Sequence, residues 1–216
     1  MTFWPRASAP TRLNAMSCEP VTPAASLRRF RLATIHDIDA MQRIYARARE
    51  LMSARGNPTQ WGMSYPTRDV IEQDIRHHQV MLFVDDVIDN AGSSASNGAD
   101  SDGTMPHAVP QERILAQFAL CPGPDPDYAH IEGAWLDDDP YVAIHRVASA
   151  GLVRHAARDA IAWVVEHHGN VRVDTHPNNH AMQHTLETMG FARCGLIQVS
   201  DREYDATRIA YQRHEW

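Results

Sequence analysis

Hydrophobic positions along the chain follow two alternating spacings. Short runs of Val, Ile, Leu and Phe are typical of strands, and segments in which apolar residues recur every three or four positions are typical of helices. Strands and helices that alternate in this way predict an α/β fold with one mixed sheet and helices on both faces. The predicted strands are 27–33, 79–86, 113–121, part of 130–136, 141–149, 171–176, 191–200 and 207–214, and the predicted helices are 38–52, 67–75, 156–164 and about 178–189.

Polar residues mark the expected starts of three of these helices. Thr34 and Asp37 have the spacing of a capping pair, and Thr67 stands before the second helix. Asn179 follows Pro177 at the start of the last helix. The side chains of such residues accept hydrogen bonds from backbone N–H groups that a helix leaves unpaired in its first turn.

Two stretches of the chain show neither the spacing of strands nor that of helices. Residues 1–26 scatter Pro, Ala, Ser and Thr without a period and predict a disordered leader. Residues 89–112 are rich in Gly, Ser, Asn and Asp and predict a flexible insertion between two strands, either a solvated loop or an active-site lid. The remaining length, in a chain of 216 residues of which 44% are hydrophobic, suits a single domain over 27–216 with one core.

Composition narrows the classes of function. The chain has 20 basic and 27 acidic residues, a formal net charge of -7, and no basic stripe, which argues against a nucleic-acid partner. The three cysteines, Cys18, Cys121 and Cys194, lie far apart, which argues against a disulfide framework or a thiolate zinc site. No apolar run has the length of a membrane span and the first residues lack an apolar signal core, so we expect a cytoplasmic protein without a membrane partner.

The stretch RVASAGLVRHAARDAI, residues 146–161, joins a predicted strand directly to a predicted helix through small residues. The first turn of a helix presents unpaired N–H groups and the positive end of the helix dipole, a combination that binds phosphate. Arg154 and His155 lie where the chain enters the helix and could add donors. The alternative is a tight strand–helix connection that binds no ligand.

Several sequence segments, in the order in which they occur along residues 27–214, resemble the GNAT superfamily of N-acyltransferases. They are RVASAGLVRHAARDAI, the segment NHAMQHTLETMGF (179–191), and GNPTQWGMSYPTRDVIEQDI (56–75) together with YAHIEGAWL and YVAIHRVAS. The last set resembles a branch of small members that have a Gln-Trp and Tyr-Pro substrate loop. The resemblance implies a mostly antiparallel sheet of about six to seven strands, transfer of an acyl group from coenzyme A to an amine, and a homodimer.

The resemblance also implies which residues contact the cofactor. Leu152 and His155 stand where the family's phosphate loop usually has Gln or Arg and Gly, while Ala157 agrees with it. Leu186 stands where many relatives have a tyrosine that acts as a general acid. The expected cofactor residues are Val147, whose backbone N–H falls near the family's oxyanion position, and Ser149, Leu152, Val153, Arg154, His155, Ala156, Ala157 and Asn179.

The reaction needs a base, because an alkylamine with a pKa near 10 is protonated at neutral pH. His145 is the first candidate, since an imidazole can accept a proton and the strand places it beside the expected thioester; strand alternation would put His145, Val147 and Ser149 on one face. Glu132 is the second candidate. A structural histidine and an ordinary exposed carboxylate are the alternatives. Trp61 and Tyr65 are expected to line the acceptor pocket, or else to pack in the core.

A histidine metal site is not expected. His176, His180 and His184 are spaced by four, but Pro177 begins the helix after His176, and Ala181 replaces the glutamate of zinc hydrolases. The resemblance therefore implies an acetyltransferase that uses acetyl-CoA as co-substrate and acetylates a small amine by direct attack in a ternary complex, and we expect no metal. The alternative is a non-catalytic module that binds acyl-CoA or another ligand on the same fold.

Overall fold

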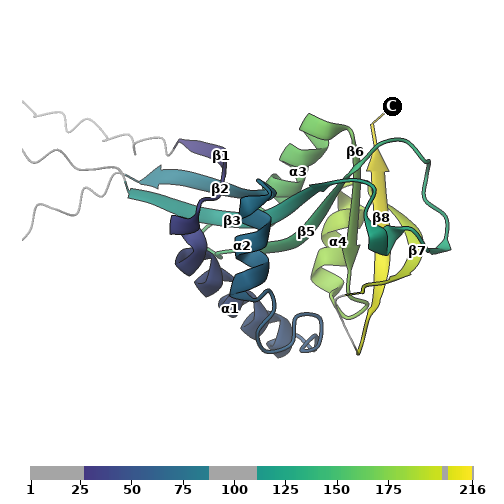
Figure 1. Cartoon of the computed structure of the whole chain (residues 1–216), viewed down its shortest axis with the longest axis horizontal. Coiled ribbons are helices and arrows are strands. Elements are labelled where there is room, and N and C mark those ends of the chain that lie inside the picture. The colour runs from purple at the N-terminus through teal and green to yellow at the C-terminus, as the bar shows by residue number, and fades with distance from the viewer. Residues whose placement is uncertain (1–26, 88–110, 201–203, 216) are drawn as a thin grey trace, which may run out of the picture.

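The computed structural model describes residues 27–87, 111–200 and 204–215, which form one open sheet covered by helices (Figure 1). The expected leader 1–26 and residues 89–110 of the expected insertion lie outside the described residues, whereas Gln111 and Glu112 belong to a strand. None of the helices in the described part of the chain has the length and apolar character that a membrane span requires. The strands are β1 (Arg28–Leu32), β2 (Val80–Val87), β3 (Gln111–Pro122), β4 (Glu132–Gly133), β5 (Val142–Ser149), β6 (Asn170–Thr175), β7 (Ala192–Gln198) and β8 (Thr207–His214), and the α-helices are α1 (Ile38–Ala54), α2 (Arg68–Arg76), α3 (Ala156–His168) and α4 (His180–Thr188).

The sheet order is β1-β2-β3-β5-β6-β8-β7-β4. Every neighbouring pair is antiparallel except β5 and β6, which run parallel. The mixed, mostly antiparallel architecture is confirmed, with eight strands rather than six to seven in the described residues. The parallel pair joins only Val142–Ile144 to Val171–Val173, so β5 and β6 separate beyond that point.

Helices cover both faces of the sheet, as expected (Figure 1). On one face, α1 and α2 pack on β2 through a cluster that includes the buried side chains of Met41, Ile71 and Leu82. On the other face, α3 and α4 pack through a larger cluster that includes Ile161 and Leu186. The apolar residues that recur along each helix therefore form the two layers of the core.

Three predicted helix starts are confirmed by their hydrogen bonds. The Asp37 carboxylate accepts from the Thr34 N–H at 2.7 Å, in a capping box on a short 3-10 helix (Ile35–Asp37) that leads directly into α1. The Thr67 hydroxyl accepts from the Val70 N–H at 3.4 Å, and the Asn179 side-chain oxygen accepts from the Met182 N–H at 3.2 Å. Asn179 is thus a helix cap, the alternative that the sequence left open beside a cofactor contact.

A β-bulge interrupts β5. Gln117 of β3 pairs with Ala148 and Ala119 pairs with His145, so β5 has one more residue than β3 across this step, and Arg146 has a φ of 54°. The expected shared face of His145, Val147 and Ser149 is therefore wrong. Val147 packs into the same cluster as Ile144, on the face of α3 and α4, while the His145 ring contacts Tyr128 on the opposite face.

Candidate active site

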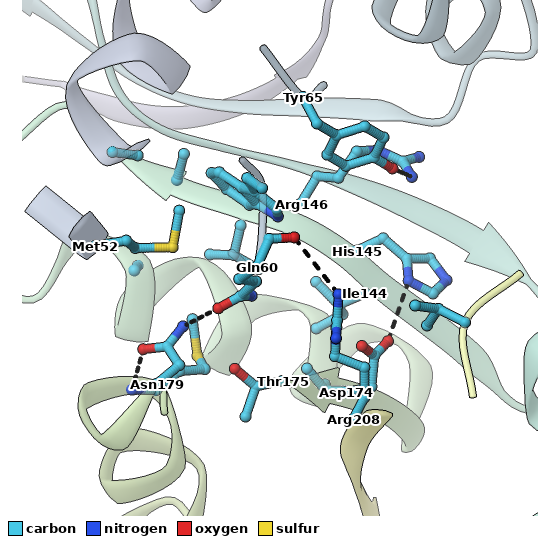
Figure 2. A pocket seen from close by; sticks show the side chains of 18 of the residues that line it. Met52, Gln60, Tyr65, Ile144, His145, Arg146, Asp174, Thr175, Asn179 and Arg208 are labelled. Atoms are coloured by element: carbon cyan, nitrogen blue, oxygen red, sulfur yellow. Dashed lines mark hydrogen bonds and ion pairs between the residues drawn. The ribbon is translucent and has the colours of Figure 1, made fainter. Parts of the chain in front are cut away.

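A cavity of about 390 Å³ opens where β5 and β6 separate (Figure 2). Its walls come from the end of α1, the segment between α1 and α2, β5, β6, the start of α4 and β8. A wedge between two parallel strands that have parted is a natural ligand site because its strand edges are not paired with each other. Seven of the residues expected at the site line this cavity: Trp61, Tyr65, His145, Val147, Ser149, Ala157 and Asn179.

The other expected site residues lie outside this lining. Glu132 is exposed on the edge strand β4, paired with Leu196 of β7. Leu152 is 54% exposed and faces a neighbouring cavity. Val153 packs against the core, to which the buried Ala156 belongs. Arg154 and His155 are exposed.

The turn between β5 and α3 leaves its backbone donors open. Ala150 donates its N–H to the Leu115 carbonyl, Gly151 donates to the Ser149 hydroxyl, and Asp159 donates to the His155 carbonyl. Within the described residues, the N–H groups of residues 152–157 make no hydrogen bond. A row of unpaired donors at the start of a helix of 13 residues suits an anionic group.

His155, which stands where the phosphate loop of the GNAT superfamily usually has a glycine, adopts a backbone conformation that glycine favours. Its φ is 64°, in the left-handed region, and it is the N-cap of α3. The His155 side chain is exposed. A non-glycine residue therefore occupies this turn without covering the open N–H groups, at the cost of about 1 kcal/mol of backbone strain.

His145 lies between two carboxylates. Its Nδ1 is 3.6 Å from Asp174 Oδ1 (Figure 2), and its Nε2 is 2.8 Å from Asp125 Oδ2. Asp174 Oδ1 also accepts from the Tyr128 hydroxyl at 2.9 Å. Burial opposes protonation of the ring, but the hydrogen bonds with Asp125 and Asp174 outweigh it and raise the pKa of His145 to about 9. At neutral pH this side chain is therefore held mainly as an imidazolium.

Arg146, in the bulge, connects β5 to α2 and to the part of the cavity wall formed by Tyr65. Its Nη2 is 2.7 Å from the Asp74 carboxylate of α2, and its Nη1 donates to the Tyr65 hydroxyl at 3.2 Å. Burial raises the pKa of Asp74, and the Arg146 charge opposes that rise. The ion pair with Asp74 fixes the guanidinium that in turn orients the Tyr65 ring.

Gln60 holds the segment between α1 and α2 against the part of the cavity wall formed by α4 and β8. Its side-chain oxygen accepts from Asn179 at 3.0 Å (Figure 2) and from Asn57 at 2.6 Å. Its backbone carbonyl accepts from Arg208 at 3.5 Å. The segment that contains Trp61 and Tyr65 is thereby tied to the cap of α4 and to β8.

Two buried side-chain polar atoms of lining residues, Arg146 Nε and the Thr175 hydroxyl, have no hydrogen-bond partner among the described residues. The Thr175 hydroxyl, on a residue that is 1% exposed, makes no hydrogen bond there. Because a buried hydroxyl without a partner is costly, a polar ligand atom in the cavity would gain from it.

In the described part of the chain, one group of side chains has ligand atoms close enough together to hold a metal ion: Asp137, Asp139 and His214. Both carboxylate oxygens of Asp137 already have partners: Oδ1 accepts from Asn170 at 3.0 Å, and Oδ2 accepts from Gln212 at 3.2 Å and lies 2.9 Å from His214 Nδ1. This cluster therefore acts as a hydrogen-bonding link between the segment before β5 and the strands β6 and β8.

Asp125, Asp174, Gln60 and Arg208 were not expected at the site. Each is polar and partly or wholly buried, and they come from four separate segments. Asp174, near the end of the buried strand β6, was the most predictable of the four from the sequence, because a carboxylate next to a buried run needs a partner.

No protein-family model matches the chain. No curated protein sequence matches it significantly either.

Solved structures do resemble it. A GNAT-family acetyltransferase from Streptococcus agalactiae 2603 is 24% identical with a TM-score of 0.67, and the match covers 88% of this chain and 96% of that chain. A GNAT-family acetyltransferase from Listeria monocytogenes 4b F2365 is 17% identical with a TM-score of 0.56, covering 90% and 98%. A chain of the NatC complex bound to Gag peptide and CoA is 9% identical with a TM-score of 0.50, covering 88% and 99%.

Proposed function

We propose, from the GNAT acetyltransferase fold of this chain, that it transfers an acetyl group from acetyl-CoA to a small amine by direct attack in a ternary complex. The observation that carries the proposal is the cavity between β5 and β6, which Ser149 and Ala157 line on either side of the turn with the open N–H groups. In this proposal those N–H groups bind the diphosphate of the cofactor. The acyl end then lies between the separated strands, next to the β5 bulge.

The bulge supplies a candidate for the oxyanion donor. Val147 has no partner residue on β3 or on β6, because the bulge displaces it from one ladder and the separation of the strands removes it from the other. Its N–H is therefore our choice to stabilise the negative charge that develops on the thioester oxygen. A preorganised backbone donor of this kind contributes about 3 to 4 kcal/mol in other acyl-transfer enzymes.

His145 is our choice for the base. It lines the cavity two residues before Val147, whereas Glu132, the other expected base, lies on the edge strand outside the lining. The neutral imidazole would take the proton that the amine loses on attack, and the carboxylates of Asp125 and Asp174 would stabilise the resulting imidazolium. Trp61 and Tyr65 would form the wall against which the acceptor binds.

The raised pKa of His145 predicts an alkaline pH profile. Below about pH 9 the ring is mainly protonated and cannot accept a proton, so kcat/KM should rise with pH through that value. Asp125→Asn removes the negative charge that favours the imidazolium and keeps the side-chain shape. The pKa of His145 should fall, and the rising limb should move to lower pH by about one unit.

Profiles of kcat/KM against pH, measured with one amine for both proteins, test this expectation. The amine's own ionisation is the same in the two series, so the difference between them reports the enzyme. Asp138→Asn is the matched control, because it changes an exposed carboxylate that lies outside the cavity lining. Superimposable profiles for wild type and Asp125→Asn would remove His145 from the role of base.

The proposed function is tested in two steps. Calorimetry with acetyl-CoA measures binding, and release of free thiol measured over a panel of amines detects transfer. Binding followed by amine-dependent thiol release supports the proposal. Binding without transfer to any amine would favour the non-catalytic module, a reading that the protonated state of His145 at neutral pH also favours. No binding would contradict both.

A further inference from the structure

A second cavity, of about 380 Å³, lies beside the turn between β5 and α3. It is bounded by α1, by the start of β3 and by the turn itself. Its lining includes four charged residues and two residues of the turn: Asp37, Arg43, Arg47, Glu112, Ala150 and Leu152. Because Ala150 and Leu152 belong to the turn whose N–H groups are open, this cavity adjoins the proposed diphosphate site.

The Arg47 guanidinium lies against the backbone of that turn. Its Nε and Nη2 are 3.4 Å from the position that a Cβ atom would take on Gly151, which has a φ of 74°. The absence of a side chain at Gly151 therefore allows a cation to approach the turn closely. Arg43 lies one helical turn earlier on the same face of α1 and lines the same cavity.

The charges around this cavity leave both arginines available. Its two carboxylates are occupied by strand β1: Asp37 pairs with Arg31 at 2.7 Å, and Glu112 pairs with Arg29 and Arg31. Arg43 and Arg47 form no ion pair with any residue in 27–87, 111–200 or 204–215. Both side chains are exposed. Two uncompensated guanidinium groups thus stand beside a row of unpaired N–H groups.

We propose that Arg47, assisted by Arg43, binds the diphosphate of the cofactor from the α1 side, opposite the N–H groups of residues 152–157. This inference rests on the proposed function, because it assigns part of the binding of the same cofactor. A planar guanidinium presents two parallel donors to phosphate oxygens, and hydrogen bonds between ionised groups are stronger than neutral ones. The pair of arginines would hold the nucleotide end of the cofactor while leaving the acyl end to the β5–β6 wedge.

Three acetyl donors separate this role from a general effect on binding. Acetyl-CoA has both the diphosphate and the 3′-phosphate, acetyl-dephospho-CoA keeps only the diphosphate, and S-acetylpantetheine has neither. Arg47→Gln should raise KM about five- to tenfold for the first two donors and leave kcat/KM for S-acetylpantetheine unchanged. The double variant Arg43→Gln/Arg47→Gln should raise KM for acetyl-CoA and acetyl-dephospho-CoA further. Arg47→Lys should give a KM between those of the wild type and Arg47→Gln.

Arg193→Gln is the matched control. Arg193 is exposed on β7, away from both cavities, so its substitution removes one positive charge without touching the proposed site. KM should not change for any donor. A thermal melt should show that all of these surface variants remain folded.

The outcomes separate the two proposals. If the wild type binds CoA in calorimetry and Arg47→Gln binds it equally well, the role of Arg47 is wrong and the proposed function stands. An effect with acetyl-CoA but not with acetyl-dephospho-CoA would place Arg47 on the 3′-phosphate and also contradict the diphosphate assignment. A wild type that binds no CoA would overturn both.

Discussion

His145→Ala is expected to lower kcat by at least about tenfold, with little change in the affinity for acetyl-CoA. The reason is that His145 lines the acceptor side of the wedge, between Asp125 and Asp174, whereas the proposed cofactor contacts are backbone groups of residues 152–157. Positioned acid–base groups typically contribute about 10²- to 10⁴-fold, so the lower bound is conservative. Steady-state kinetics of thiol release give kcat, and calorimetry with acetyl-CoA gives the affinity.

His184→Ala is the control for this substitution. His184 is exposed on α4 and does not line the cavity, so its replacement should leave both constants unchanged. Unchanged kinetics in His145→Ala would show that a water molecule or another carboxylate accepts the proton. A large loss of cofactor affinity would instead indicate that His145 maintains the shape of the wedge.

Leu186→Ala is expected to reduce the free energy of unfolding by about 2 to 5 kcal/mol. The Leu186 side chain is 0% exposed in the cluster that joins α3 and α4 to the sheet, so its removal leaves a cavity that the surrounding core can fill only in part. In a domain of this size such a loss lowers Tm by roughly 4 to 20 °C. Chemical denaturation and a thermal melt measure the two quantities.

Leu152→Ala makes the same chemical change at an exposed position. Leu152 is 54% exposed, so its replacement should alter the free energy of unfolding by less than about 1 kcal/mol. Equal stability losses in the two variants would contradict the packing of Leu186. Leu186 is not among the lining residues of the cavity, and its side chain has no group that can donate a proton.

Most of the fold was predictable because it depends on patterns within single segments. The apolar spacing of α1 and α3 and the caps at Thr67 and Asn179 are local features, and all four are confirmed. The cavity residues Trp61 and His145 were predicted from a resemblance that extends over most of the chain. The leader and most of the insertion stay predictions, as do the homodimer and the cytoplasmic location.

The part that could not be predicted depends on contacts between distant segments. A bulge moves every later residue of its strand to the opposite face of the sheet. The amino-acid sequence around Arg146 contains no signal that predicts the bulge. The pKa of His145 depends on Asp125, twenty positions earlier, and on Asp174 of a different strand. An isolated imidazole suggested a base ready at neutral pH, and its neighbours instead favour the protonated form.

The position of β8 has a consequence for how the protein is made. β8 lies between β6 and β7 in the sheet, although both of these strands precede it in the chain. While the ribosome is still extending the polypeptide toward residue 207, β6 and β7 each expose a backbone edge that has no partner strand in the finished sheet except β8. The half of the sheet built from β1, β2 and β3 faces no such delay, so nascent chains should fold it first and complete the half built from β6, β7 and β8 last.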